Sequence, residues 1–369
     1  MNPKTHKYLI SGGGTGGHIF PAIAIAEAIK ARDERAQFLF VGAIGKMEMK
    51  KVPDAGYPII GLPISGFKRT LSTKNLLFPF KLMCSLRKAA RIIRTYNPDV
   101  VIGTGGYASG PTLYMASRKK IPCLIQEQNA FPGITNKTLA KHVDKICVAY
   151  SGMETYFPKE KIILTGNPIR KELQSSRKNT LEARRFFGIE NENKTILVVG
   201  GSQGSRAINQ QLINILPALL QKVNVIWQTG ETGIGQANEI VHQAHDMKLS
   251  IQKFIKRMDL AYTAADIVIS RAGAIAISEL AVAGKCTLLI PMPQSAEDHQ
   301  TKNANRLAGS NAAICLPQNE LAEKMLPILM ELLNNEKKIQ RMEENIKKFG
   351  LPEAAGAIAE EILKLIEKQ

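Results

Sequence analysis

The sequence predicts an α/β protein made of two Rossmann-like domains, each built on a parallel sheet. The chain has 369 residues, more than the roughly 100 to 200 of a typical domain. Short apolar runs rich in β-branched residues alternate with helical segments, a pattern typical of parallel βαβ units. The alternation occurs twice, once on each side of a polar stretch at residues 170–195.

The expected strands follow one another along each half of the chain. In the first half they are residues 8–10, 38–41, 100–102, 122–125, 146–148 and 162–164. In the second half they are residues 196–199, 223–227, 267–269, 287–290 and 313–315. A turn-like Gly-Asn-Pro marks the boundary, so we expect an N-terminal domain over residues 1–166 and a C-terminal domain over residues 167–350. Apolar residues at helical spacing predict a final amphipathic helix within residues 351–369.

Composition and charge restrict the class of protein. The hydrophobic fraction of 44% is that of an ordinary globular protein, and five cysteines without a CxxC pair are expected to be reduced core residues. We find no apolar run long enough for a transmembrane helix and no signal-peptide pattern, so we expect a cytoplasmic location. The net charge of +17 favours a polyanionic partner: a nucleic acid, an anionic membrane or a phosphorylated substrate.

A glycine-rich loop, GGGTGGH at residues 12–18, follows the first expected strand and precedes a helical run. Free backbone N–H groups and the helix dipole converge at such a turn, which favours an anion site. The loop also matches the GxGxxG pattern of dinucleotide sites. The acidic residue that usually ends the second strand of those sites is missing, because residues 40–45 read FVGAIG. NAD is therefore not expected.

His18 ends this loop and is a candidate general base. A helix N-terminus disfavours the imidazolium ion, which keeps the ring neutral and able to accept a proton. The alternative is that His18 only caps the helix. The glycines around it favour the catalytic role.

Two further glycine-rich loops follow expected strands: GTGGYASGP at residues 103–111 and GGSQGSR at residues 200–206. A single glycine-rich loop could equally be a tight turn or a binding site. Three such loops, each after an expected strand, favour binding. In the second domain, residues 270–274 lead into a helix that contains Glu279. Glu279 could accept hydrogen bonds from both hydroxyls of a ribose, or it could be an exposed helix glutamate. The polar residues 297–303 could address sugar hydroxyls.

The sequence shows no metal-ligand pattern, because it has no DxD, no HExxH and no Cys/His spacing of ligand type. A departing diphosphate would instead be neutralised by helix N-termini and by basic side chains such as Arg170. We therefore expect no metal and no other cofactor.

The stretch between Asp54 and Asp99 is basic and contains no acidic residue. Its cations are interleaved with apolar residues, a pattern that fits contact with an anionic bilayer. The expected membrane contacts are Leu76, Leu77, Phe78 and Phe80. The alternative is that these apolar residues are core and that the charges form a solvated helix face.

Five motifs in order make nearly the whole chain resemble the MurG family of N-acetylglucosaminyltransferases. They are GGTGGH at 13–18, GGYASGP at 105–111, EQN at 127–129, GNPIR at 166–170 and GGSQG at 200–204. The resemblance implies a GT-B fold, in which two Rossmann-like domains face each other across a cleft. It implies transfer of N-acetylglucosamine from UDP-N-acetylglucosamine (UDP-GlcNAc) to the muramoyl 4-hydroxyl of lipid I, with inversion at the anomeric carbon. The product is lipid II, a peptidoglycan precursor.

The resemblance also implies roles for individual residues. His18 is the expected base. The expected contacts of UDP-GlcNAc are Thr15, Gly16, Gly17, Asn129, Arg170, Ser202, Ile255, Ala274, Ile275, Ala276, Ile277, Ser278, Glu279 and Gln300. Arg170 and Ser202 are expected at the diphosphate and Glu279 at the ribose. The diphosphate of the acceptor is expected at Gly105, Gly106 and Tyr107. The chain departs from the common family pattern at His299, where glutamine is frequent, and at Gln126, where some members have histidine.

The expected partners are UDP-GlcNAc, lipid I, the cytoplasmic surface of the cell membrane, where the chain would lie peripherally, and other proteins of cell-wall synthesis. The rival classes are a GT-B enzyme that glucosylates diacylglycerol, a nucleotide-binding dehydrogenase or epimerase, and a nucleic-acid binder. The motifs at 127–129 and 166–170 argue against the first, and the missing acidic residue argues against a dehydrogenase. No nucleic-acid partner is expected, because we find no stacking aromatic platform and no known module.

Overall fold

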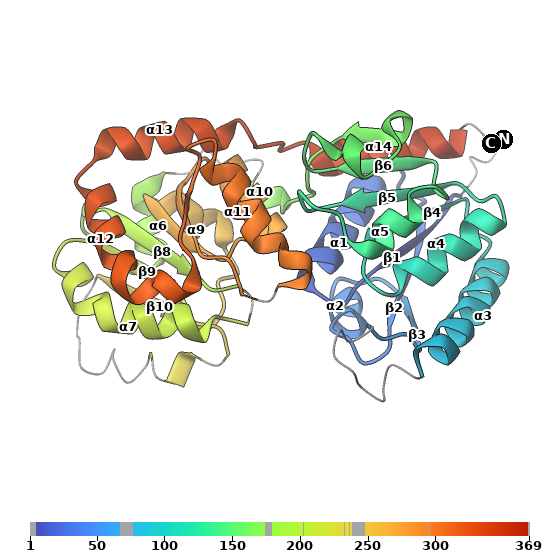
Figure 1. Cartoon of the computed structure of the whole chain (residues 1–369), viewed down its shortest axis with the longest axis horizontal. Coiled ribbons are helices and arrows are strands. Elements are labelled where there is room, and N and C mark those ends of the chain that lie inside the picture. The colour runs from blue at the N-terminus through green and yellow to red at the C-terminus, as the bar shows by residue number, and fades with distance from the viewer. Residues whose placement is uncertain are drawn as a thin grey trace. The chain divides into compact units, whose positions relative to one another are not determined.

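The computed structural model describes residues 5–66, 77–173, 179–201, 203–231, 233–235, 237, 248–293 and 295–367. The chain forms two compact units: unit 1 comprises Met1–Ile169 and Pro352–Gln369, and unit 2 comprises Arg170–Leu351. Each unit is a parallel sheet covered by helices (Figure 1). The predicted α/β class with two parallel sheets is therefore confirmed.

Unit 1 is built on a seven-stranded parallel sheet of order β3-β2-β1-β4-β5-β6-β7. Its strands are β1 (Lys7–Gly12), β2 (Gln37–Ala43), β3 (Ile59–Leu62), β4 (Val100–Gly105), β5 (Cys123–Glu127), β6 (Lys145–Val148) and β7 (Ile162–Leu164). Its helices are α1 (Gly16–Lys30), α2 (Glu48–Asp54), α3 (Phe78–Tyr96), α4 (Ser109–Arg118), α5 (Ile134–Leu139), α14 (Ala354–Glu367) and the 3-10 turns η2 (Met153–Thr155) and η3 (Lys159–Lys161). The sequence did not predict β3, because its four residues include a glycine and follow a proline closely.

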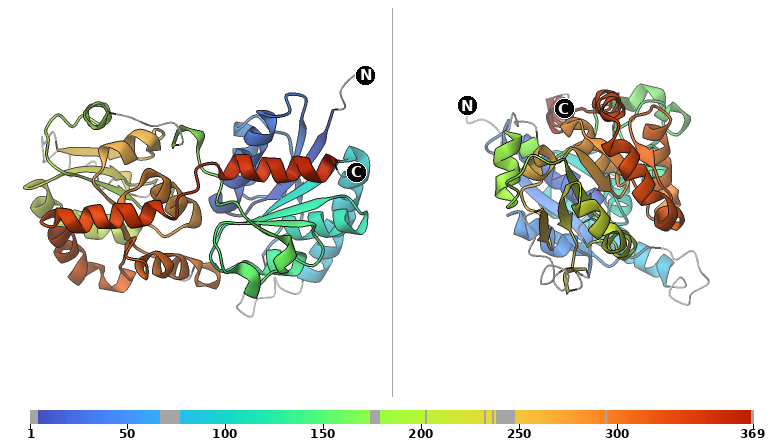
Figure 2. Two further views of the ribbon diagram at one scale, coloured as in Figure 1. Left: turned by 90° about the horizontal axis from the view of Figure 1, so that it is seen from above. Right: turned by 90° about the vertical axis from the view of Figure 1, so that its left-hand side faces the viewer.

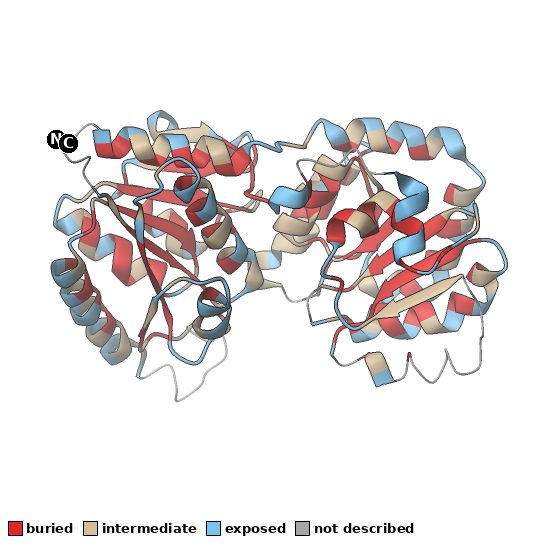
Figure 3. Cartoon of the chain, turned by 180° about the vertical axis from the view of Figure 1, so that it is seen from behind, coloured by how far each residue is buried: buried red, intermediate tan, exposed pale blue. Residues whose placement is uncertain are grey.

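Two hydrophobic clusters cover the two faces of this sheet. Along β1, Leu9 belongs to one cluster, whereas Tyr8 and Ile10 belong to the other, as the alternation of side chains along a strand requires. Figure 3 shows the central strands as buried. Because both faces are covered, the strands read as nearly continuous apolar runs in the sequence.

Helix α14 follows unit 2 in the chain but belongs to unit 1, where it lies along α1 (Figure 2). Ile358, Ile362 and Ile366 recur every four residues and join the cluster that contains Ile25 and Ile29 of α1. The sequence predicted this helix. Its spacing could not show which unit the apolar face covers.

Unit 2 is built on a six-stranded parallel sheet of order β10-β9-β8-β11-β12-β13. Its strands are β8 (Thr195–Val199), β9 (Asn224–Gln228), β10 (Leu249–Gln252), β11 (Ile267–Ser270), β12 (Cys286–Leu289) and β13 (Ile314–Cys315). Its helices are α6 (Thr180–Phe186), α7 (Arg206–Leu220), α9 (Met258–Ala264), α10 (Ala274–Ala283), α11 (His299–Ala308), α12 (Leu321–Leu333), α13 (Glu336–Lys347) and the 3-10 turns η4 (Lys171–Leu173), η5 (Ala296–Asp298) and η6 (Gln318–Glu320). The edge strand β10 is partly exposed and was not predicted.

The strand order of each sheet reverses at one point, between β1 and β4 in unit 1 and between β8 and β11 in unit 2. In open parallel sheets, ligands bind outside the carboxyl ends of the strands at such a switch point. The glycine-rich loops of the sequence follow β1, β4 and β8. The topology therefore places them where ligands of this fold class bind.

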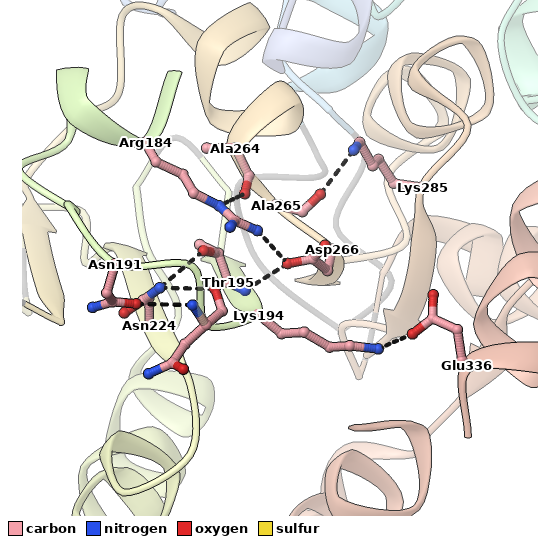
Figure 4. A network of polar contacts seen from close by, with 11 residues as sticks. Arg184, Asn191, Lys194, Thr195, Asn224, Ala264, Ala265, Asp266, Lys285 and Glu336 are labelled. Carbon is pink, nitrogen blue, oxygen red and sulfur yellow. Dashed lines mark hydrogen bonds and ion pairs between the residues drawn. The ribbon is translucent and has the colours of Figure 1, made fainter. Parts of the chain in front are cut away.

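A polar network joins the opposite, amino-terminal ends of β8 and β11 (Figure 4). The carboxylate of Asp266 accepts a hydrogen bond from the backbone N–H of Thr195 at 2.6 Å and from Nη2 of Arg184 at 2.7 Å. The Nε of Arg184, whose side chain is buried, donates to the carbonyl of Ala264 at 3.2 Å. This network stabilises unit 2 at the edge remote from the glycine-rich loop after β8.

The five cysteines are free thiols, as expected from their spacing, but Cys84 and Cys315 are half-buried rather than core residues. Cys123, Cys147 and Cys286 are buried, and burial raises the pKa of the Cys147 thiol to about 12. These three thiols are therefore protonated core residues at neutral pH.

Candidate active site

The loops after β1 and β4 pack directly against each other at the switch point of unit 1. The backbone N–H of Gly13 donates to the carbonyl of Gly105 at 3.2 Å. Gly105 and Gly106 have φ angles of +98° and +89°, a region that favours glycine. A Cβ on Gly106 would lie 2.2 Å from the carbonyl oxygen of Gly13, and one on Gly105 would lie 2.8 Å from the His18 ring. The glycines therefore let one loop approach the other and leave room for the imidazole.

His18 lies in the first turn of α1, and its ring is held on one side by two oxygens. Its Nδ1 is 2.8 Å from the carbonyl oxygen of Thr104 and 3.1 Å from Oε1 of Gln128. A carbonyl oxygen can only accept a hydrogen bond, so Nδ1 carries a proton, and in the neutral imidazole the lone pair is then on Nε2. The N-cap residue of α1 is Thr15, so His18 does not cap the helix. Its geometry fits the alternative of a proton acceptor at Nε2.

The expected contact Asn129 is oriented by its neighbour Glu127 at the end of β5. The buried carboxylate of Glu127 accepts hydrogen bonds from the backbone N–H of Asn129 at 2.9 Å and from its Nδ2 at 3.1 Å. The same carboxylate accepts from Nδ2 of Asn136 at 2.8 Å. The Glu-Gln-Asn motif thus acts as one unit: Glu127 fixes the turn, Gln128 contacts His18, and Asn129 is held at the loop.

Glu48, at the start of α2, is a site residue that the sequence did not reveal. It is fully buried; its Oε2 accepts the N–H of Gly14 and its Oε1 accepts the N–H of Ala43, both at 2.9 Å. A glutamate in the first turn of a helix is usually solvated, so nothing in its sequence position indicated burial. Glu48 anchors the first glycine-rich loop to the end of β2.

Glu279 in unit 2 is buried, which excludes the alternative of an exposed helix glutamate. Its Oε1 pairs with Nε of Arg170 at 3.2 Å, and its Oε2 accepts a hydrogen bond from the hydroxyl of Tyr262 at 3.2 Å. Burial raises the pKa of Glu279, and the charge of Arg170 opposes that shift. The side chain of Arg170 is 40% exposed, so the pair reaches the protein surface. Tyr262 is a second residue that the sequence did not reveal.

Gln228, at the end of β9, connects two of the expected donor-binding segments. Its Nε2 donates to the carbonyl of Gly201 at 2.9 Å, and its Oε1 accepts the backbone N–H of Ile255 at 2.8 Å. Ile255 is buried, and its backbone N–H is already bonded to Gln228, so the structure shows no exposed part of this expected contact. The neighbouring expected contact Ser202 lies outside the described residues.

Arg271, directly after β11, ties together the loops at the carboxyl edge of the second sheet. Its guanidinium donates to Oγ of Ser205 at 2.6 Å, to the carbonyl of Pro291 at 3.0 Å and to Oε1 of Gln318 at 2.6 Å. Ser205 is the N-cap of α7, where its Oγ accepts the N–H of Ile208. Burial lowers the pKa of Arg271. Through its hydrogen bond to Ser205, Arg271 fixes the N-terminus of α7, which follows the glycine-rich loop.

Gln300 lies in the first turn of α11, next to a strained segment. Its Oε1 accepts the backbone N–H of Met292 at 2.9 Å. Glu297 and Asp298, just before the helix, have φ angles of +52° and +57°. Such conformations of residues other than glycine are costly and concentrate at functional sites. The sequence indicated only a polar loop here.

The remaining expected contacts differ in exposure. Thr15 and Gly17 are exposed and Gly16 is half-buried on the first loop, and Tyr107 is exposed on the second. On α10, Ile275, Ala276 and Ser278 are half-buried, whereas Ala274 and Ile277 are buried. Ile277 is 1% exposed, so the structure shows no exposed part of this expected contact. Among the residues that the structure describes, no group of three or more His, Cys, Asp or Glu could hold a metal ion.

Helix α3 exposes apolar side chains at its start. Leu77 and Phe80 are 56% and 70% exposed, and Met83 is exposed on the same face one turn later. The helix packs on unit 1 through other positions, among them Ala89 and Ile93. Leu77 and Phe80 are therefore not core residues, which excludes that alternative for them. Phe78 is half-buried, and Leu76 lies outside the described residues. None of the described helices combines the length and apolarity that a membrane span requires.

Both units match domains of one known family. Residues 8–148 match the glycosyltransferase family 28 N-terminal domain, and residues 195–358 match the glycosyltransferase family 28 C-terminal domain. Together with the two parallel sheets and the loops at their carboxyl edges, these matches define a glycosyltransferase of the GT-B class.

Relatives of the chain share more than its fold. A UDP-N-acetylglucosamine–N-acetylmuramyl-(pentapeptide) pyrophosphoryl-undecaprenol N-acetylglucosamine transferase of Bacteroides fragilis is 50% identical, over 98% of this chain and 96% of the relative. An enzyme of the same name from Parabacteroides distasonis is 47% identical, over 99% of this chain and 100% of the relative. The crystal structure of Acinetobacter baumannii MurG is 29% identical, with a TM-score of 0.78 over 97% of this chain and 99% of that one. The chain belongs to the MurG family, as its motifs predicted.

Proposed function

We infer that the chain carries out the reaction named for its relatives. It transfers N-acetylglucosamine from UDP-GlcNAc to the muramoyl 4-hydroxyl of lipid I, with inversion at the anomeric carbon, and so forms lipid II for peptidoglycan synthesis. The observation that carries this conclusion is identity of 50% over nearly the full length of a transferase of that name.

We propose His18 as the general base of the transfer. As the 4-hydroxyl oxygen of the acceptor bonds to C1 of the donor sugar, its proton passes to Nε2 of His18, and the bond from C1 to the UDP oxygen breaks. The other ring proton stays on Nδ1 during this step and is hydrogen-bonded to the carbonyl oxygen of Thr104. Proton transfer by a positioned base contributes roughly 10²- to 10⁴-fold to a rate.

We propose that unit 2 binds the nucleotide of UDP-GlcNAc. In this proposal the carboxylate of Glu279 accepts hydrogen bonds from ribose hydroxyls, and the partly exposed Arg170 beside it supplies a cation for the diphosphate. The N-terminus of α7, held by Arg271, adds backbone N–H groups and the positive end of a helix dipole. These groups support the proposal that the reaction needs no metal and no other cofactor, and EDTA should then leave turnover unchanged.

We also propose which residues contact the donor sugar and the diphosphate of the acceptor. The donor sugar is proposed to contact Thr15, Gly16, Gly17 and Asn129 of unit 1 and Gln300 of unit 2. The acceptor diphosphate is proposed to contact Gly105, Gly106 and Tyr107. The loops at residues 15–17 and 105–107 follow β1 and β4, the two strands at the switch point of unit 1, which supports both proposals.

We propose that the chain acts peripherally at the cytoplasmic face of the cell membrane, where its acceptor is anchored by a lipid. Leu77, Phe80 and Met83 form an exposed apolar stripe at the start of α3. The rest of the helix carries five cations and no acidic residue, which supports contact with an anionic bilayer. Other proteins of cell-wall synthesis are the expected protein partners, and nucleic acid is not.

The product of the reaction tests this function. The protein would be incubated with UDP-GlcNAc and a soluble lipid I analogue, and the isolated product would be analysed by NMR. We expect a β-linked N-acetylglucosamine on the muramoyl 4-hydroxyl. Transfer to diacylglycerol instead, or conversion of UDP-GlcNAc to another sugar nucleotide without acceptor, would contradict the proposal.

A further inference from the structure

The ring of His18 is backed by three buried amide side chains, those of Gln126, Gln128 and Asn167. Nε2 of Gln126 donates to Oδ1 of Asn167 at 2.8 Å, and Nδ2 of Asn167 donates to the backbone carbonyl of Gln128 at 3.0 Å. Nε2 of Gln128 donates to the backbone carbonyls of Thr104 at 2.8 Å and of Gln126 at 3.1 Å. Each amide therefore has defined partners on protein groups.

These partners fix which end of the Gln128 amide faces His18. If the amide were turned over, its oxygen would point at the Thr104 and Gln126 carbonyls, and acceptor would face acceptor. The observed orientation leaves Oε1 beside Nδ1 of His18 at 3.1 Å. The imidazole thus meets two acceptors at Nδ1, the other being the Thr104 carbonyl.

We propose that Gln128 is a positioning residue for catalysis: its side-chain oxygen and the Thr104 carbonyl hold His18 as the Nδ1–H tautomer, with the lone pair on Nε2. This inference rests on the proposed role of His18 as the base. In the other tautomer, the Nδ1 lone pair would face both oxygens, so the arrangement disfavours that form. Gln126 and Asn167 in turn hold Gln128.

The residue at position 128 also decides whether a charged or a neutral group contacts the ring of His18. A carboxylate within hydrogen-bond distance would favour the imidazolium ion and keep the ring protonated near neutral pH. A neutral amide oxygen orients the ring without adding a negative charge. Gln128 therefore supports a base that is neutral before it reacts.

The charged groups near this ring have other partners. Glu48 of α2 binds the N–H groups of Gly14 and Ala43, and Glu127 at the end of β5 binds Asn129, Asn136 and the N–H of Gly133. Strand β1 carries Lys7 at its opposite end, and β4 carries no charged residue. Helix α14 pairs its Glu360 with Arg32, beyond the C-terminal end of α1. A carboxylate introduced at position 128 would thus be the charge in direct contact with the imidazole.

NMR of histidine-labelled protein tests the proposal without turnover, and His18→Ala identifies the His18 signals. We expect the Nδ1–H tautomer in the wild-type protein. In Gln128→Glu we expect the pKa of His18 to rise by roughly 1 to 3 units, and the acidic limb of the kcat/KM profile to move with it. A wild-type Nε2–H tautomer, or an unchanged pKa of His18 in folded Gln128→Glu, would overturn the proposal.

A second variant covers the case in which Gln128→Glu does not fold. Gln128→Met has a similar volume and removes the oxygen from Nδ1. We expect kcat to fall by about tenfold or more while binding of UDP-GlcNAc is retained, because the ring is no longer held in its productive orientation. Wild-type kcat in Gln128→Met would overturn the proposal. Full activity of His18→Ala would instead refute the base role itself, so the two failures are distinguishable.

Discussion

The Nε of Arg170 lies 3.2 Å from Oε1 of Glu279, and the hydroxyl of Tyr262 lies 3.2 Å from the other carboxylate oxygen. These contacts satisfy a glutamate that is buried on a helix of unit 2. Burial nonetheless raises the pKa of Glu279 above its ordinary value of 4.5. A charged carboxylate at this position therefore costs stability, as expected of a group kept for binding.

Glu279→Gln should separate the binding role of this carboxylate from its effect on stability. Loss of charged hydrogen bonds to the ribose should weaken binding of UDP-GlcNAc by about 1.5 to 3 kcal/mol, roughly 10- to 100-fold, as measured by calorimetry. The exposed pair Lys253–Glu231 offers a control. Glu231→Gln should leave donor binding unchanged.

The stability of Glu279→Gln should also depend on pH in a defined direction. A carboxyl group whose folded pKa is raised contributes stability that is full below its unfolded pKa and is lost as pH rises through the folded pKa. The free energy of unfolding of Glu279→Gln, relative to wild type, should therefore increase as pH rises above about 4.5. A relative stability that instead falls with pH in urea titrations would contradict this account.

Gly105→Ala should impair the base while leaving the donor site on unit 2 intact. The new Cβ would lie 2.8 Å from the His18 ring, at a φ of +98°. We expect kcat to fall by about tenfold or more and stability to fall by about 1 to 3 kcal/mol, with donor affinity retained. Gly56→Ala is a matched control, because Gly56 has a φ of +83° but open space around its Cβ position. It should cost stability yet preserve kcat; equal kcat losses in both variants would refute the role of the ring contact.

Asp266→Asn should destabilise unit 2 without changing its chemistry. Asp266 accepts hydrogen bonds from Thr195 and from the buried Arg184 at the edge of the sheet remote from the loop after β8. We expect a loss of about 1 to 3 kcal/mol in chemical unfolding, with kcat unchanged at temperatures where the variant is folded. Lys194→Ala, which removes an exposed pair with Glu336, should cost at most about 1 kcal/mol. A similar small loss for Asp266→Asn would contradict the structural role of the network.

The double variant Leu77→Ser/Phe80→Ser should weaken binding to anionic vesicles at least tenfold, because each buried apolar side chain contributes roughly 1.5 to 3 kcal/mol. Turnover of a soluble lipid I analogue should be unchanged. Leu181 and Phe186 on α6 of unit 2 are also exposed, so Leu181→Ser/Phe186→Ser controls for a general loss of apolar surface. Sedimentation of both variants with vesicles makes the comparison. Equal binding by both would exclude α3 as the membrane contact.

The elements most visible in the sequence were those with strong periodicity. The central strands are apolar throughout because both faces are buried, and α14 repeats isoleucines at helical spacing. The edge strands β3 and β10 were not predicted: β3 contains a glycine and follows a proline closely, and only two of the four residues of β10 are apolar. His18 could be named as a candidate base because it follows glycines at a helix N-terminus.

The residues that hold the site could not be found in the same way. Glu48, Gln128 and Gln228 act on loops that are distant in sequence, and each is an ordinary polar residue until the sheet register brings those loops together. Their signal is burial of a polar side chain, which only the structure shows. The motif at residues 127–129 pointed to Gln128, but not to its contact with the imidazole.

The most direct test of the account is UDP release from UDP-GlcNAc, measured with and without a soluble lipid I analogue, in the wild type and in His18→Ala. We predict that UDP release requires the acceptor. We also predict a fall in kcat of roughly 10²- to 10⁴-fold in the variant, with donor affinity retained. Release at the same rate without acceptor would contradict the transferase function, and near wild-type kcat in His18→Ala would contradict the role of His18 as the base.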